Sequence, residues 1–183
     1  SACLVGSEMC IRDRFNDILV GDFMMNVTLI CVGNLKEKYF KDACAEYTKR
    51  LGVFCKFNIV EVNEEKLPDK PSQSDIDNTI KKEGERIIAK IPKGAMIFAM
   101  CIEGTLISSE QLADKIQTAG LDGKSELVFI IGGSWGLSDE VKRISNARIS
   151  MSRMTFPHQL ARVLLCEQIY RAFQINSNGK YHK

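Results

Sequence analysis

The chain has 183 residues, of which 45% are hydrophobic and 26% are charged. This length suffices for one domain with a sizeable core, and the composition excludes a disordered or fibrous chain. No apolar run approaches the roughly 18 residues that span a bilayer, which argues against a membrane protein. The formal net charge of +2 is compatible with an RNA partner but does not require one.

The cysteines are scattered, and no pair has CxxC spacing. Seven cysteines and only two histidines argue against both a disulfide framework and a zinc site, so we expect no metal. Because most of the cysteines lie in apolar runs, we expect small core residues in a reducing compartment. They are Cys3, Cys10, Cys31, Cys44, Cys55, Cys101 and Cys166.

Residues 1–24 differ from the rest of the chain. Their net charge is −2, which leaves +4 on residues 25–183. They lack the basic start, apolar core and cleavage site of a secretory signal, and they show no helical or strand period. The stretch CLVGSEMCIRDR resembles translated sequencing-adapter read-through. We interpret residues 1–24 as a non-native, disordered leader before a single domain at 25–183; a genuine, poorly ordered extension is the alternative.

From Met25 the hydrophobic pattern alternates between strands and helices. The pattern predicts strands at residues 26–32, 54–62, 95–102, 126–131 and 147–151. It predicts helices at residues 36–51, 75–90, 109–118 and 160–175, and a short helix capped by Ser138. The first helix has one apolar face, formed by Tyr39, Phe40, Ala43, Cys44 and Tyr47, and the apolar positions of the second are Ile76, Ile80, Ile87 and Ile88. Nearly unbroken apolar runs are typical of strands buried on both faces. We therefore predict an α/β fold with a mostly parallel sheet covered by helices.

One motif, IIGGSWGLS, covers residues 130–138. An apolar run ends in Gly132 and Gly133, with Trp135 and Gly136 close behind. Glycines at the carboxyl end of a strand let a backbone approach a ligand, and open α/β sheets bind ligands at that edge. A bare glycine pair is equally consistent with a tight strand-to-helix turn. The spacing matches neither the GxGxxG fingerprint nor the P-loop, which disfavours a dinucleotide-binding or NTP-binding enzyme.

A second motif, MSRMTFPHQLARVLLCEQIYRAF, covers residues 151–173. Pro157 stands where a loop enters the last predicted helix, a position that proline favours. Met151, Met154 and Phe156 are apolar residues within that loop. They indicate either ordinary core packing or the wall of a pocket.

Polar residues near the C-terminus are candidates for RNA chemistry. Arg153 and Arg162 suit RNA phosphates, although single arginines usually lie on a solvated surface. The chain ends in Tyr181, His182 and Lys183. Such side chains are able to bind a base or transfer a proton, although polar tails are normally frayed.

Together and in this order, these motifs resemble the ribosomal RNA large subunit methyltransferase H family. The resembling segments are VGNLKEKYF, IEGTLISSE, IGGSWGLS, MTFPHQLARVLLCEQIYRAF and the terminal YHK. The resemblance covers residues 25–183. It implies a SPOUT-type fold with a C-terminal trefoil knot, and a cytoplasmic homodimer. It also implies methylation, dependent on S-adenosylmethionine, of N3 of a pseudouridine in 23S rRNA on the assembled ribosome.

The resemblance further implies which residues carry the function. The tail residues His182 and Tyr181 are candidates for handling the N3 proton, with Arg153 or Lys183 as an electrostatic helper. Met100 stands where the family commonly has leucine, a change that keeps an apolar wall for adenine. The residues expected to bind S-adenosylmethionine are Met100, Gly132, Met151, Ser152, Arg153, Met154, Thr155 and Phe156.

Three alternatives stay open at this point. The chain could be another SPOUT methyltransferase with a different RNA target, although the terminal YHK favours the pseudouridine enzyme. It could be a non-catalytic RNA-binding or ribosome-assembly module on the same fold, which would show no saturable binding of S-adenosylmethionine. A flavodoxin-like or nucleotide-binding protein is disfavoured by the motif spacing.

Overall fold

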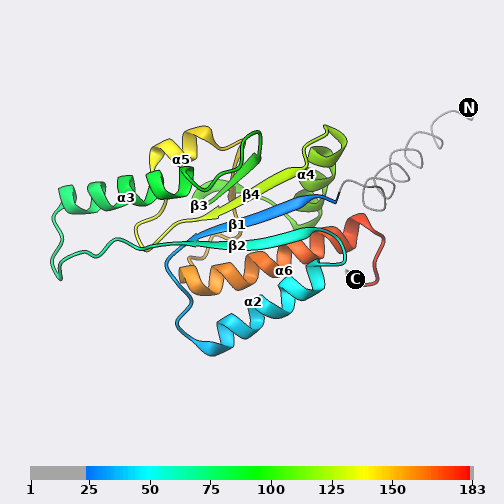
Figure 1. Ribbon diagram of the computed structural model, residues 1–183, viewed down its shortest axis with the longest axis horizontal. Coiled ribbons are helices and arrows are strands. Elements are labelled where there is room, and N and C mark those ends of the chain that lie inside the picture. Colours follow the sequence, from blue (N-terminus) through cyan, green and yellow to red (C-terminus); the bar gives the residue numbers. More distant parts are fainter. Residues whose placement is uncertain (1–23, 182–183) are drawn as a thin grey trace, which may run out of the picture.

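A computed structural model describes residues 24–181. Strands and helices alternate along this part of the chain, as the sequence predicts (Figure 1). The elements are β1 (Asn26–Val32), α2 (Lys38–Leu51), β2 (Lys56–Val62), α3 (Gln73–Ile88), β3 (Met96–Leu106), α4 (Ser109–Leu121), β4 (Glu126–Ile131), α5 (Asp139–Ile144), β5 (Ala147–Ser150) and α6 (His158–Asn176). The proposed leader lies almost wholly outside the described residues, so it stays a prediction.

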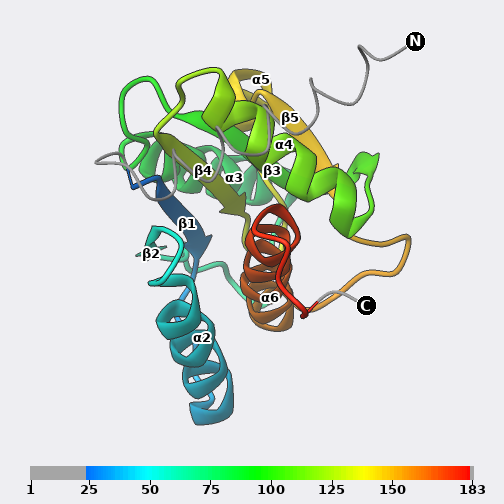
Figure 2. The same cartoon turned by 90° about the vertical axis from the view of Figure 1, so that its right-hand side faces the viewer.

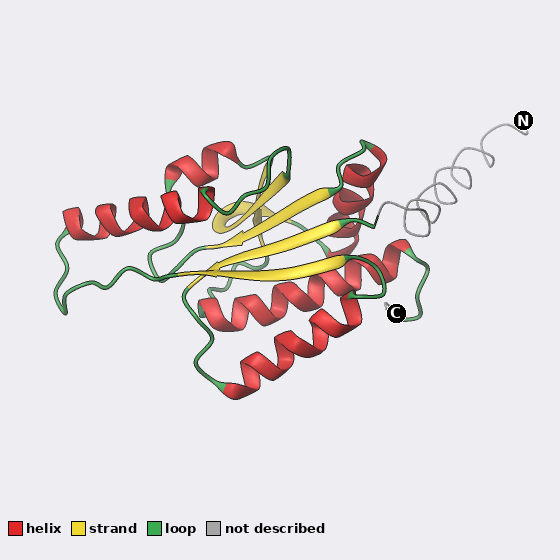
Figure 3. Ribbon diagram, in the orientation of Figure 1, coloured by secondary structure: helices red, strands yellow, loops and turns green. Residues whose placement is uncertain are grey.

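The five strands form one parallel sheet in the order β2-β1-β4-β3-β5. Parallel neighbours need crossover connections, and here each crossover contains a helix (Figure 3). Strands β1 and β4 lie inside the sheet and are buried along almost their whole length. All five carboxyl ends therefore meet at one edge, where the loops that follow the strands gather.

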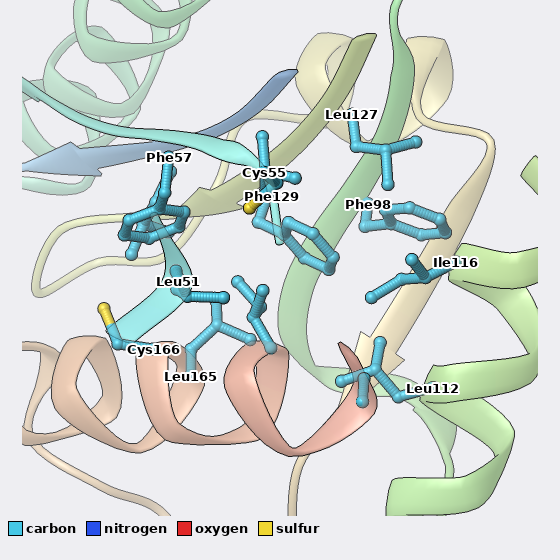
Figure 4. Close-up of a cluster of buried hydrophobic side chains, with 14 of the residues drawn as sticks. Leu51, Cys55, Phe57, Phe98, Leu112, Ile116, Leu127, Phe129, Leu165 and Cys166 are labelled. Carbon is cyan, nitrogen blue, oxygen red and sulfur yellow. The ribbon is translucent and has the colours of Figure 1, made fainter. Parts of the chain in front are cut away.

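Helices cover both faces of the sheet, as predicted. On one face α2, α4 and α6 enclose the larger core cluster, in which the rings of Phe98 and Phe129 stack with centroids 4.9 Å apart (Figure 4). On the other face α3 and α5 contribute Ile87 and Val141 to a smaller cluster. Within residues 24–181, no helix has the length and apolarity needed to cross a membrane.

Side-chain caps fix where several helices begin. Ser72 and Ser108 each form a capping box at the start of α3 and α4. The predicted Ser138 cap on α5 is confirmed, because its hydroxyl accepts a hydrogen bond from the Val141 N–H at 3.3 Å.

The predicted apolar face of the first helix is only partly correct. Cys44 and Leu51 are the buried residues of α2, whereas Tyr39 is 63% exposed. The first turns of α2 point away from the sheet, so only the later turns pack against it (Figure 2).

Arg162 of α6 is buried, with 1% of its surface exposed, so the prediction that it binds RNA phosphates is wrong. Its guanidinium donates to the Glu61 carboxylate at the end of β2 and, at 2.8 Å, to the Gly33 carbonyl after β1. The Leu35 N–H also donates to the same Glu61 oxygen at 3.3 Å. Arg162 therefore ties α6 to the carboxyl ends of two strands.

Removal of this buried cation should destabilise the fold. We expect Arg162→Ala to lower the free energy of unfolding by about 3 kcal/mol, because the Glu61 and Gly33 oxygens lose their partner. Arg143→Ala is the matched control; its side chain is 78% exposed, so the change should stay within about 0.5 kcal/mol. Urea unfolding followed by circular dichroism measures both. Equal losses in the two variants would contradict this role for Arg162.

Candidate functional site

A cavity of about 850 Å³ opens at the carboxyl edge of the sheet. Its size suits a small organic ligand or cofactor. Segments far apart in the sequence line it. They are residues 100–103 of β3, residues 131–137 from the end of β4 onward, residues 149–152 and 154–157 around and after the end of β5, and the first turn of α6 with His158 and Ala161.

A bulge in β3 opens one wall of the cavity. The pairing of β3 with β5 runs to Met100 opposite Ile149, breaks, and resumes at Thr105. At Gly104 the backbones touch, because a Cβ there would lie 2.6 Å from the Ile149 carbonyl carbon. This contact holds β3 against β5 while the residues between Met100 and Gly104 face the cavity.

The glycine turn, residues 132–138, forms the second wall. A Cβ on Gly132 would lie 2.5 Å from the Gly136 carbonyl oxygen, so no larger residue fits. The Gly136 N–H donates to the Gly133 carbonyl at 3.1 Å, and Gly136 has a φ of +85°, which favours glycine. The turn presents backbone to the cavity and carries Trp135, which is 47% exposed, on its rim.

The β5–α6 loop, residues 151–157, forms the third wall. The Ser150 hydroxyl donates to the Ser152 carbonyl at 2.9 Å, and the Ser152 hydroxyl accepts from the Met154 N–H at 2.9 Å. These bonds fold the loop on itself. Pro157 then begins α6 with no side-chain cap, which leaves the first N–H groups of the helix and its positive dipole end for a polar ligand group.

One ion pair lies on the rim of the cavity. The Lys142 ammonium of α5 lies 2.6 Å from the Glu103 carboxylate. The hydrogen bond from Lys142 lowers the pKa of Glu103 below its usual range. Glu103 is therefore ionised at neutral pH.

Seven of the eight predicted cofactor residues line this one cavity. They are Met100, Gly132, Met151, Ser152, Met154, Thr155 and Phe156. Arg153 belongs to the same loop and is exposed, but it is absent from the lining. The structure therefore brings the donor-side residues together and leaves Arg153 beside them.

The predicted acceptor residues lie elsewhere or are not described. Tyr181 contacts α6 instead of the cavity: its hydroxyl lies 3.3 Å from Glu167, and the Arg171 guanidinium stands 4.8 Å from its ring centroid. Partial burial, with Tyr47 and Glu167 nearby, raises the pKa of Tyr181 above its usual value. His182 lies outside the described residues.

The lining residues that were not assigned from the sequence include Trp135, His158, Glu103 and Lys142. Trp135 and His158 lie within the two quoted motifs. Their closeness in sequence to assigned residues was the signal that could have placed them at the cavity. Glu103 stands in the IEGTLISSE segment, to which no site residue was assigned, and Lys142 stands in none of the quoted segments. They come together only because the bulge of β3 faces α5.

Comparison with known proteins places this geometry in a family. The family model described as "Predicted SPOUT methyltransferase" matches residues 25–182. Proteins named "Ribosomal RNA large subunit methyltransferase H" from Clostridium novyi and Ligilactobacillus salivarius are each 52% identical over 159 residues. These matches cover 87% of this chain and 100% of each relative. A relative of the same name from Bacillus pumilus is 51% identical with the same coverage.

A solved structure supports the fold. A methylase family protein from Neisseria gonorrhoeae superimposes with a TM-score of 0.50 at 15% identity, covering 82% of this chain and 84% of that one. The family model that matches residues 25–182 identifies the chain as a methyltransferase of the SPOUT class. More particularly, the chain belongs to the ribosomal RNA large subunit methyltransferase H family.

The contact at Gly132 yields a sharp test. We expect Gly132→Ala to weaken binding of S-adenosylmethionine by about tenfold or more, because its Cβ displaces Gly136 and misplaces the turn. Gly52→Ala is the control, since Gly52 has a φ of −58° and its added Cβ would lie 3.3 Å from the Lys49 carbonyl oxygen. Calorimetric titration measures both. Unchanged affinity in Gly132→Ala would show that the turn does not shape the binding site.

Proposed function

We propose that this chain transfers a methyl group from S-adenosylmethionine to N3 of a pseudouridine in 23S rRNA, on the assembled ribosome. One observation carries the proposal: seven residues that the family resemblance implies for the cofactor line one cavity. The relatives named for large subunit RNA methylation are aligned over their full length at about half identity, which supports the RNA target.

The cavity fits the proposed cofactor by the chemistry of its walls. Met100, Ile149 and Met154 offer apolar surface for adenine. The close contact at Gly132 keeps a side chain out of the cradle. Ser152 and the uncapped start of α6 supply polar partners for the amino-acid part of the cofactor. When bound, S-adenosylmethionine supplies a methyl group on a positively charged sulfur.

The protein must also position the acceptor and manage the N3 proton. Positioning of nucleophile, methyl carbon and sulfur in line accounts for much of such a rate. We assign proton acceptance to the His182 imidazole. The Tyr181 hydroxyl is a hydrogen-bond donor at neutral pH, so we assign it the orientation of the base. Arg153, exposed beside the cavity, supplies positive charge for the RNA.

We also propose a homodimer in which α6 packs across a two-fold axis. Leu160, Val163 and Leu164 of α6 are only partly buried in a single chain, which supports an apolar contact there. A C-terminal trefoil knot is part of the same proposal. In its support, the chain leaves β5 at the sheet border and returns to place α6 against α2 and α4.

The RNA target is tested by methylation of ribosomes with and without the target pseudouridine. We expect methyl transfer to intact ribosomes that carry the pseudouridine, and much less to free 23S rRNA, because the modest charge favours recognition of assembled shape. Radiolabelled methyl incorporation and mass spectrometry of the modified base measure it. Absence of methylation on pseudouridine-bearing ribosomes would refute this target.

The tail assignment is tested by His182→Ala under single-turnover conditions at saturating ribosome. We expect a rate loss of about a hundredfold, as for removal of a general base, with unchanged affinity for S-adenosylmethionine. Lys180→Ala, in the same tail, should retain the rate. If His182→Ala retained the wild-type rate as well, His182 would not be the base.

The competing function is a non-catalytic RNA-binding or ribosome-assembly module. Calorimetry distinguishes the two, because such a module shows no saturable binding of S-adenosylmethionine. The enzyme is favoured by the cavity, which is lined by seven of the eight residues implied for the cofactor.

A further inference from the structure

Helix α3 buries polar residues where its pattern predicts an apolar face. The sequence predicts that Ile76, Ile80, Ile87 and Ile88 point inward, and of these only Ile87 is fully buried. Glu83 and Gly84 are buried instead, and Glu83 is only 4% exposed. A carboxylate is seldom buried in a core unless it has a functional role or hydrogen-bonding partners there.

Gly84 lets α3 lie directly against the glycine turn. A Cβ at residue 84 would lie 2.3 Å from the Ser138 hydroxyl oxygen. Ser138 ends the turn and caps α5. The missing side chain therefore allows the helix to touch the residue that fixes the end of the turn.

Glu83 makes the reciprocal contact at the other end of the turn. A Cβ on Gly133 would lie 3.0 Å from the Glu83 Oε2 atom and 3.1 Å from Val32 Cγ1. Gly133 lines the cavity, whereas Glu83 does not. The carboxylate thus packs against the side of the turn that faces away from the cavity.

The second oxygen of Glu83 is fixed by the loop after β2. Glu83 Oε1 accepts a hydrogen bond from the Glu65 N–H at 2.9 Å. The Glu65 side chain in turn pairs with Lys82 at 2.8 Å and with Arg86, and Arg86 donates to the Asn63 carbonyl at 2.9 Å. Glu83 therefore cannot move away from Gly133 without breaking a bond to a loop that is itself fixed to α3.

We propose that Glu83 is a positioning residue for the methyl-donor site, with its carboxylate holding the Gly133 backbone from behind. Gly84, which has no side chain, lets Ser138 at the end of the turn pack directly against α3. The inference rests on the proposed function, since it assigns the glycine turn to S-adenosylmethionine. Glu83 touches neither cofactor nor RNA in this assignment and acts through the turn alone.

The test uses cofactor affinity in the full chain. Trp135 is the single tryptophan and lies on the cavity rim, so its fluorescence reports binding, with calorimetry as an independent measure. We expect Glu83→Ala to raise the Kd for S-adenosylmethionine about tenfold, because support for the turn is lost. Glu83→Gln, which keeps the volume and an acceptor for the Glu65 N–H, should restore most of the affinity.

Two controls on the same helix separate positioning from stability. Glu85 is exposed, so Glu85→Ala should leave the Kd unchanged. Ile87→Val removes one methyl group from the core that α3 shares with the sheet and with Leu137 of the turn. It should lower the melting temperature, with a much smaller change in the Kd than Glu83→Ala. In steady-state assays Glu83→Ala should raise KM for S-adenosylmethionine while KM for the ribosome stays constant.

The outcomes are distinct. An unchanged Kd in Glu83→Ala, or an equal rise in Ile87→Val, overturns the inference. If Glu83→Ala does not fold, Glu83→Asp replaces it; the shorter side chain cannot reach both Gly133 and the Glu65 N–H, so its Kd should also rise. Failure of the wild-type chain to bind S-adenosylmethionine would instead refute the proposed function.

Discussion

The common direction of the five strands is the constraint on which the site depends. Because every strand runs the same way, the bulge of β3, the glycine turn and the β5–α6 loop all gather at one edge. A parallel sheet buried on both faces offers such an edge as the natural place for a ligand. The cavity follows from the topology, and the side chains determine what it accepts.

Close backbone contacts turn that edge into a defined cavity. The missing side chain of Gly104 lets β3 contact the backbone of β5, and that of Gly132 lets the two ends of the glycine turn touch at Gly136. At each place a single methyl group would force a wall to move. Arg162 also holds α6 in place, because its hydrogen bonds join the helix to the ends of β1 and β2. The β5–α6 loop is thereby fixed at both ends, at β5 by the Gly104 contact and at α6 by Arg162.

Much of the fold was predictable from the sequence, since strands and helices follow from local hydrophobic periodicity. The bounds of β1 and β4 match the prediction because their apolar runs end abruptly at polar residues or glycine. The family motifs implied eight residues for the cofactor, and seven of these line the cavity. Periodicity alone would have left those loop residues as ordinary core.

The features that were not predicted depend on contacts between residues far apart in the sequence. Arg162 reads as a surface cation because its partners Glu61 and Gly33 lie over a hundred positions away. Glu83 and Gly84 interrupt an isoleucine pattern, and their burial depends on a turn fifty residues later. The bulge in β3 likewise arises only when β5 pairs beside it. Such features depend on tertiary contacts that no local pattern encodes.

The position of Tyr181 bears on whether the C-terminal tail serves the cavity of its own chain or that of a partner. The cavity includes Ala161 near the start of α6, whereas Tyr181 packs against Tyr170 with ring centroids 5.0 Å apart. Nine helical positions separate Ala161 from Tyr170, about 14 Å along the axis. A tail held that far along α6 is badly placed to serve the cavity of its own chain. Antiparallel packing of α6 across the proposed two-fold axis would bring the tail towards the partner's cavity, so the proposed dimer would reconcile the position of Tyr181 with the proposed tail chemistry.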